Sequence, residues 1–246
     1  MGLIKVINRT LIKMRHNLSK KSKIKNKKIV ITGSNSGIGL ELTKELVNDN
    51  VVISITNENS NGINKIKNNN LQILSQNLEI DDFPEDFISE IKKFKPNIVI
   101  NCAATFGPKE QNFIKLESQK FNKILNVNFF SPLKISQYAF LGEHLNQVVN
   151  ISSEMGSISR NKKGGFYYYR LSKTILNSFS KNLALELKQN NINVFCIHPG
   201  SVKTKMNSSG LMSAEVSAQK IINIISKNDA ALSGEFLNIN GDTIKW

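Results

Sequence analysis

The stretch KKIVITGSNSGIGLELTKELV, residues 27–47, decides how the chain folds. It begins with a β-branched run at 27–32, turns through three glycines and continues as an amphipathic helical pattern. Gly33 permits a tight turn, Gly37 lets the main chain approach a pyrophosphate, and Gly39 lets the helix pack close to the strand. The amino end of the helix then faces the anion. This order predicts a dinucleotide site in a parallel sheet.

The rest of the chain alternates strand and helix patterns in the same way. Further strands are expected at 51–56, 71–76, 97–104, 147–153, 192–199 and 234–240. The longest helices are expected near 113–142 and 166–190, and no repeat or Pro-rich linker follows residue 28. We therefore expect an α/β fold with a single doubly wound, Rossmann-type domain, in which helices cover both faces of seven parallel strands.

Composition narrows the class of protein. No stretch approaches the roughly 18 continuous apolar residues of a membrane span. The two cysteines, Cys102 and Cys196, lie in apolar runs, which is typical of reduced core thiols in a cytoplasmic protein. Histidine, cysteine and carboxylate side chains form no cluster with ligand spacing, so no metal is expected.

Charge is concentrated at the amino end. Ten of the basic residues and no acid fall within the first 28 positions, so about +4 of the formal +14 belongs to the rest of the chain. We expect no specific nucleic acid as a partner, because the rest of the chain has neither a basic stripe nor an aromatic RNA-reading motif, and nucleic-acid binding through the basic leader is a weaker alternative. We expect a basic amphipathic extension at 1–26 and the folded domain at 27–246. Three interpretations of the extension stay open: a flexible or self-packed segment, a peripheral membrane anchor formed by residues 1–20, and an organelle-targeting peptide.

The stretch GGFYYYRLSK, residues 164–173, places three tyrosines before a lysine. In a helix, residues four apart share a face, so Lys173 stands over Tyr169 and not over Tyr167 or Tyr168. A positive Lys173 would lower the pKa of Tyr169 from its usual value of about 10 towards the working pH. The same spacing also describes an ordinary solvated helix face, so the pair needs support from other motifs.

That support comes from a family resemblance. TGSNSGIG, at 32–39, resembles the cofactor loop of the classical short-chain dehydrogenase/reductase family. NCAA at 101–104, VNFFSP at 127–132, NISSEMG at 150–156, YxxxK at 169–173 and HPGSVKT at 198–204 resemble its later motifs in order. The carboxyl-terminal half is similar to the C-factor-like carbonyl reductase branch, through SSEMGSI, GGFYYYRLSKTILN and SGEFLNINGDTIKW.

The resemblance implies the residues of the site. The implied catalytic residues are Asn128, Ser153, Tyr169 and Lys173, with Ser153 preferred to Ser152 by its spacing from the glycine. The cofactor-binding residues are expected to be Gly33, Asn35, Ser36, Gly37, Ile38, Gly39, Thr56, Asn57, Asn77, Leu78, Asn101, Ala103, Tyr169, Lys173, Pro199, Gly200, Val202 and Thr204. Tyr169 would exchange a proton with a carbonyl that Ser153 binds, Lys173 would hold the nicotinamide ribose, and Asn128 would position a water.

Several positions depart from the family pattern. Ala104 replaces the last glycine of NAG, Asn77 stands where an aspartate is usual, and RNKKGG at 160–165 predicts an enlarged loop. The end of the second strand offers Thr56 and Asn57, whereas an NAD site normally has an acid there. This favours NADP(H) slightly over NAD(H).

The expected function is an NAD(P)-dependent oxidoreductase that interconverts a carbonyl and a secondary alcohol on a small or medium substrate. By the same resemblance, a homo-oligomer is expected to pair the two longest helices. The alternative is a dinucleotide-sensing regulatory or signalling protein with little turnover. Loss of Tyr169 or Lys173 would indicate that alternative, and both are present.

Overall fold

A seven-stranded sheet forms the centre of the computed structural model, which describes residues 24–57 and 62–246. The expected extension therefore lies mostly outside the described residues. The strands are β1 (Lys28–Thr32), β2 (Val51–Thr56), β3 (Leu71–Ser75), β4 (Ile98–Asn101), β5 (Gln147–Ile151), β6 (Asn193–Ile197) and β7 (Phe236–Leu237). They are all parallel, in the order β3-β2-β1-β4-β5-β6-β7. This confirms the predicted doubly wound domain.

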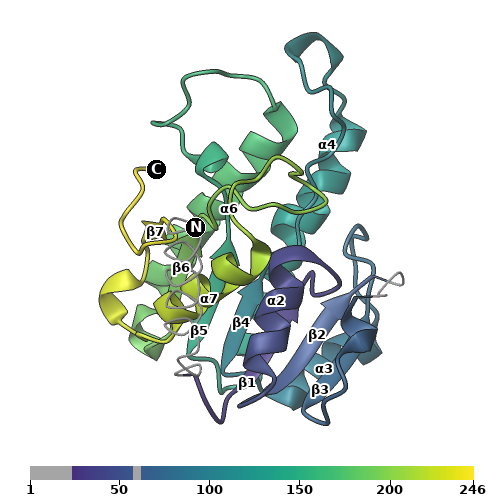
Figure 1. Cartoon of the computed structure of the whole chain (residues 1–246), viewed down its shortest axis with the longest axis vertical. Coiled ribbons are helices and arrows are strands. Elements are labelled where there is room, and N and C mark those ends of the chain that lie inside the picture. Colours follow the sequence, from purple (N-terminus) through teal and green to yellow (C-terminus); the bar gives the residue numbers. More distant parts are fainter. Residues whose placement is uncertain (1–23, 58–61) are drawn as a thin grey trace, which may run out of the picture.

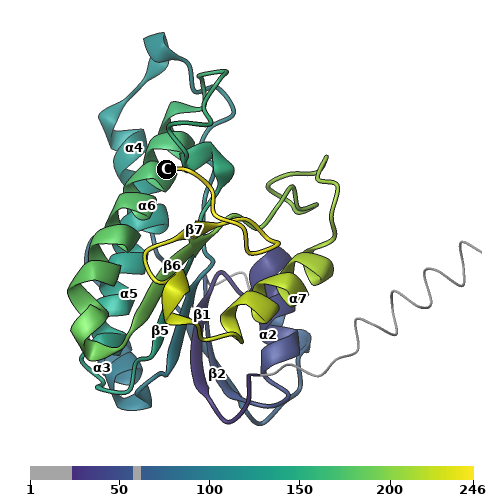
Figure 2. The same ribbon diagram turned by 90° about the vertical axis from the view of Figure 1, so that its left-hand side faces the viewer.

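Helices cover both faces of the sheet, as Figure 2 shows. They are α2 (Gly37–Leu46), α3 (Glu85–Phe94), α4 (Ser118–Leu125), α5 (Ser131–Phe140), α6 (Tyr167–Glu186) and α7 (Ala214–Ile225). In β1, Ile29 and Ile31 pack in the hydrophobic cluster beneath α2 and α7, while Val30 packs on the side of α3 and α5. Because both faces are buried, the central strands read as continuous apolar runs.

The single helix predicted at 113–142 is wrong. A 3-10 turn at Phe113–Lys115 comes first, residues 116 and 117 are extended, and a π-turn at Asn126–Phe130 separates α4 from α5. Pro132 helps to explain the π-turn, because it has no N–H to donate to the carbonyl of Asn128 four residues earlier. π-turns of this kind occur frequently at functional sites.

The strand order reverses between β1 and β4, which are neighbours in the sheet. In this fold class, ligands bind beyond the carboxyl ends of the strands at such a switch point. The Thr32 hydroxyl bridges the two strands there, accepting hydrogen bonds from the main-chain N–H groups of Cys102 (3.0 Å) and Ala103 (2.9 Å). The loops that follow β4, β5 and β6 gather at this end of the molecule (Figure 1).

Candidate active site and cofactor site

The turn between β1 and α2 has room only for glycine at two of its positions. A Cβ on Gly33, whose φ is +71°, would lie 2.7 Å from Ala103 Cα, and one on Gly39 would lie 2.3 Å from the carbonyl oxygen of Gly33. Within the described structure, Ser36 gives α2 no side-chain cap and the first turn carries no acid. The amino end of α2 is thus open to an anion, and the turn fits a pyrophosphate.

The residues after β2 and β3 are also expected to bind the cofactor, and one of them contacts this turn. Asn35 Nδ2 donates to Asn57 Oδ1 at 3.0 Å, which joins the glycine turn to the end of β2. The Thr56 hydroxyl is buried and has no hydrogen-bond partner among the described residues. Asn77 Oδ1 accepts a hydrogen bond from the Glu79 N–H, and the side chain of Leu78 packs in the core.

Two further segments border the crevice. The loop after β6 carries Pro199, Gly200 with a φ of +84°, and a buried Val202. In this loop the Thr204 methyl lies 3.2 Å from where a Cβ on Gly37 would stand, so the loop reaches across to the glycine turn.

Asn101 lies at the end of β4 but its side chain points into the interior. Its Nδ2 donates to Asn150 Oδ1 at 2.8 Å and to Ser136 Oγ at 3.3 Å. The Asn101 side chain therefore ties β4 to β5 and α5, while Ala103 is the residue that packs against Gly33.

Tyr169 and Lys173 stand one turn apart on α6, as predicted from their spacing. Lys173 Nζ is 5.9 Å from the centre of the Tyr169 ring and donates to the Ile151 carbonyl at 2.9 Å. Ser153 follows β5 and begins a 3-10 turn at Glu154–Gly156. Its neighbour Ser152 is turned away, because the Ser152 hydroxyl donates to Asn177 Oδ1 at 2.6 Å. Ser153 is the serine that lowers the pKa of Tyr169, and its Oγ also accepts a hydrogen bond from the Met155 N–H at 3.2 Å.

Burial shifts both ionisable groups towards their neutral forms. It raises the pKa of Tyr169 to about 12, although the hydrogen bond with Ser153 opposes the shift. It lowers the pKa of Lys173 to about 8. The expectation that the pKa of Tyr169 is lowered towards the working pH is therefore not met, because burial penalises the phenolate more than Ser153 stabilises it. Tyr169 holds its proton at neutral pH.

Asn128 lies fully buried in the π-turn and connects two walls of the site. It accepts from the Thr105 N–H at 2.8 Å and donates to the Thr105 carbonyl at 2.9 Å. Its Nδ2 also donates to Ser172 Oγ at 2.9 Å, and the Ser172 hydroxyl in turn donates to the Tyr169 carbonyl at 2.8 Å. In this structure Asn128 holds the segment after β4 against the helix that carries Tyr169.

Two residues of this region were missed at the level of sequence. The Phe106 ring lies 4.8 Å from that of Tyr169, centre to centre, and 5.4 Å from that of Phe166. Gln111 Oε1 accepts a hydrogen bond from the Tyr169 N–H at 3.2 Å. Neither belongs to a motif, and both contacts join residues far apart along the chain, so no local pattern could have indicated them.

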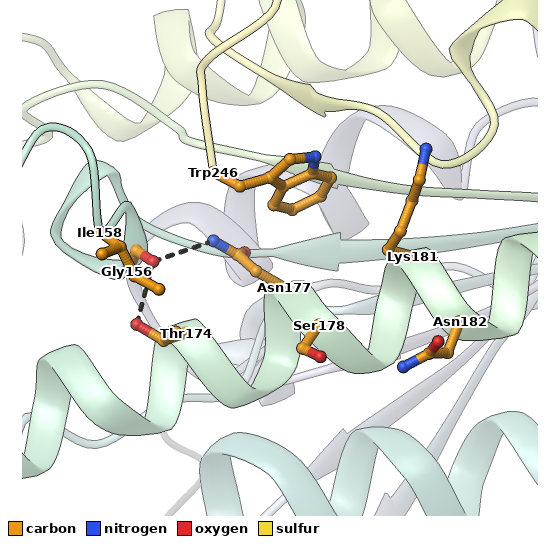
Figure 3. A pocket seen from close by; sticks show the side chains of 8 residues that line it. All are labelled: Gly156, Ile158, Thr174, Asn177, Ser178, Lys181, Asn182 and Trp246. Carbon is orange, nitrogen blue, oxygen red and sulfur yellow. Dashed lines mark hydrogen bonds between the residues drawn. The ribbon is translucent and has the colours of Figure 1, made fainter.

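A cavity of about 240 Å³ lies against α6 and is separate from this site. Figure 3 shows it between the α6 side chains Asn177, Ser178 and Lys181 and the indole of Trp246. None of the residues predicted for catalysis or cofactor binding lines it. The Trp246 ring stacks on that of Phe236 in β7, with 5.5 Å between the ring centres.

Across 24–57 and 62–246, every helix is too short or too polar to cross a membrane. The same residues contain no group of three or more His, Cys, Asp or Glu side chains that could hold a metal ion.

Comparison with known proteins decides the family. The family model for short chain dehydrogenases matches residues 27–214. The chain belongs to this family. The short-chain dehydrogenase is 31% identical over 186 residues to a 3-oxoacyl-[acyl-carrier-protein] reductase of Buchnera aphidicola, covering 73% of this chain and 75% of the relative. It is 27% identical over 128 residues to the C-signal protein of Myxococcus xanthus, covering 50% of this chain and 77% of that one.

Solved structures agree with this assignment. The carbonyl reductase Sniffer of D. melanogaster superposes with a TM-score of 0.80 at 26% identity, over 91% of this chain and all of the other. The assignment to short-chain dehydrogenases made from the motifs is therefore confirmed, and the protein is an NAD(P)-dependent oxidoreductase.

Proposed function

We propose that this short-chain dehydrogenase reduces a carbonyl group on a small or medium substrate, with Tyr169 as the proton donor, and catalyses the reverse oxidation by the same groups. The observation that carries the proposal is that Lys173 Nζ lies 5.9 Å from the Tyr169 ring and Ser153 interacts with the same tyrosine. The glycine turn of the same domain fits a pyrophosphate. A bound nicotinamide dinucleotide supplies the hydride.

The chain's own residues then handle the oxygen and the proton. The Ser153 and Tyr169 hydroxyls donate hydrogen bonds to the carbonyl oxygen, and Tyr169 passes its proton to that oxygen as negative charge develops there. Lys173 has three N–H donors, of which one binds the Ile151 carbonyl. The other two can stabilise the phenolate that forms and hold a ribose hydroxyl. Asn128, bonded to both walls, keeps this arrangement in place.

The names of the relatives support carbonyl chemistry. The 3-oxoacyl-[acyl-carrier-protein] reductase and the Sniffer carbonyl reductase are both named for the reduction of a carbonyl group. The C-signal protein, by contrast, is not named for an enzymatic activity. With Tyr169 and Lys173 both in place, no observation favours a sensing protein that does not turn over substrate.

We infer a preference for NADP(H). Thr56 and Asn57, at the end of β2, are neutral, and Asn57 already accepts a bond from Asn35. No carboxylate stands at either position to bind both ribose hydroxyls, as NAD sites usually require. Equilibrium titrations should therefore give a lower dissociation constant for NADPH than for NADH, and the reverse order would contradict the preference.

The reaction is tested by a carbonyl panel of 3-oxoacyl thioesters, diketones and aldehydes offered with NADPH. The proposal expects NADPH consumption with at least one class and recovery of the matching alcohol. Tight NADPH binding without consumption of any carbonyl would instead support the sensing protein.

We propose that the enzyme is a homo-oligomer that pairs α5 and α6 with their copies. Large apolar side chains stand exposed around these helices, among them Phe140, Leu141 and Leu185. Exposed apolar side chains that gather into one patch often mark interfaces between proteins. Sedimentation at micromolar concentration should show a dimer or tetramer, and a monomer of 27.6 kDa would contradict the pairing.

A further inference from the structure

Helix α6, which carries Tyr169, begins without a cap of its own. Its N-cap residue, Phe166, is in the left-handed region with a φ of 50° and makes no side-chain capping bond, and the first turn has no acid. Gly164 and Gly165 precede it with positive φ and open space beside each. The first N–H groups of a helix need partners from outside the helix. The first N–H groups of α6 are therefore open to a partner from another part of the chain.

The side chain of Gln111 supplies that partner. Gln111 is 4% exposed, and its Oε1 accepts from the N–H of Tyr169, the third residue of α6. This is one of the N–H groups that an N-cap side chain normally takes. Gln111 Nε2 donates to the carbonyls of Phe106 (2.7 Å) and Pro108 (2.9 Å). The buried Gln111 amide thus caps α6 and also joins the main chain of the 106–111 loop to which it belongs.

The folded loop carries an aromatic wall to Tyr169. Phe106 is held by Gln111 through its carbonyl, and its ring packs on the Tyr169 ring. A neighbouring contact ties the first turn of α6 to the chain that follows the 106–111 loop. The buried Tyr168 hydroxyl accepts a hydrogen bond from the Glu117 N–H, and the Tyr168 ring stacks on that of Phe121. Lys173 is held independently, through the carbonyl of Ile151.

We propose that Gln111 is a positioning residue for Tyr169. Its amide fixes the main chain of the tyrosine and, through the 106–111 loop, the surface against which the phenol ring lies. This inference rests on the proposed role of Tyr169 as proton donor. Loss of the amide would displace Tyr169 relative to Lys173, and a displacement of about 1 Å in an active site can cost up to roughly 100-fold in rate.

The test uses the full-length enzyme with Gln111→Met, which keeps the length of the side chain but none of its three hydrogen bonds. Amide hydrogen exchange should accelerate at Tyr169 by about 10-fold or more and stay unchanged at Lys173. The kcat should fall by about 10-fold or more, with a larger solvent deuterium isotope effect, while the Kd for NADPH stays within about 2-fold. A purely structural role would lower stability without changing the isotope effect.

Two further variants keep the test decisive. Gln111→Glu, in which burial favours the neutral carboxyl, retains the acceptor for Tyr169 and one donor, so it should fold and lose less activity than Gln111→Met. Asn112→Ala is the matched control, because Asn112 is exposed and its side chain accepts only from the Lys115 N–H. It should behave as the wild type.

The outcomes separate the inference from the function on which it rests. Unchanged kcat or unchanged Tyr169 exchange in Gln111→Met, or equal effects in Asn112→Ala, would overturn the positioning role. Full activity of Tyr169→Phe would overturn the proposed function itself, whereas an inactive Tyr169→Phe beside a fully active Gln111→Met would refute the role of Gln111 alone.

Discussion

At the scale of residues, one buried turn of α6 shifts two pKa values in opposite directions for the same reason. Desolvation penalises the charged form of each group, so it raises the pKa of Tyr169 and lowers that of Lys173. At neutral pH the tyrosine keeps its proton, and most of the lysine remains charged because its pKa of about 8 lies above the solution pH. The free enzyme is thus in the protonation state that the proposed carbonyl reduction requires.

The raised pKa of Tyr169 can be measured by alkaline titration of tyrosinate absorbance. An unperturbed tyrosine ionises near pH 10, whereas Tyr169 should hold its proton until about pH 12. We expect wild type and Tyr169→Phe to show the same amount of tyrosinate up to about pH 10.5. If Tyr169→Phe showed one tyrosinate fewer than the wild type at that pH, the raised pKa of Tyr169 would be contradicted.

The sequence predicted the proposed site residues better than it predicted the residues that surround them. Four-residue spacing placed Lys173 over Tyr169, and motif spacing selected Ser153, while Ser152 proved to bond Asn177. The direction of the Tyr169 shift was missed, because the degree of burial depends on segments such as the Phe106 loop that meet α6 only in the folded chain. Gln111 was missed for the same reason.

At the scale of elements, the turn from β1 into α2 depends on backbone contacts that a methyl group would break. Gly39 shows this most clearly, since a Cβ there would meet the Gly33 carbonyl oxygen at 2.3 Å. Only glycine at position 39 therefore lets the strand and the helix approach closely enough to present main-chain N–H groups to a ligand.

Two glycine substitutions separate contact from backbone strain. Gly39→Ala should raise the Kd for NADPH by about 10-fold or more, because the turn must open to accept the methyl group. A Cβ on Gly164 would meet no atom within 4 Å, so Gly164→Ala strains only the main chain, whose φ there is +64°. This substitution should lower stability by about 1 kcal/mol and leave the Kd for NADPH unchanged. Calorimetric titration with NADPH, with urea unfolding beside it, measures both effects. Equal Kd changes in the two variants would refute the packing argument.

The strands were predictable because parallel strands buried on both faces leave uninterrupted β-branched runs, as in β2, which spans the predicted 51–56. The helix predicted at 113–142 failed because an apolar period does not reveal the extended residues 116 and 117 or the π-turn. The π-turn is held by buried bonds of Asn128 to Thr105 and Ser172, which lie outside any local window.

At the scale of the whole molecule, the folded domain includes residues before β1. Ile24 is 6% exposed and packs in the cluster between the sheet and α7, and its carbonyl accepts from Asn50 Nδ2 at 2.9 Å. The Asn26 N–H donates to the Asp49 carbonyl at 2.9 Å. We therefore place the useful boundary for truncation after residue 23.

Removal of residues 1–23 should leave the free energy of unfolding and the reductase activity unchanged. Ile24→Ala in the full chain should lower that free energy by about 2–4 kcal/mol, since it empties part of the core, and removal of residues 1–26 should lower it at least as much. Urea unfolding of the three variants measures this. If the two truncations prove equally stable, Ile24 contributes nothing to the domain.

The central claim is that Tyr169, alone among the three adjacent tyrosines, donates the proton. The most direct test compares NADPH-dependent carbonyl reduction by wild type, Tyr169→Phe and Tyr168→Phe, with NADPH affinity measured for each. Tyr169→Phe should lose at least about 100-fold in turnover and bind NADPH within about 2-fold of wild type. Tyr168→Phe loses the hydroxyl that accepts from the Glu117 N–H and donates to the Lys115 carbonyl at 3.4 Å, and it should stay active. An active Tyr169→Phe beside an inactive Tyr168→Phe would contradict the claim.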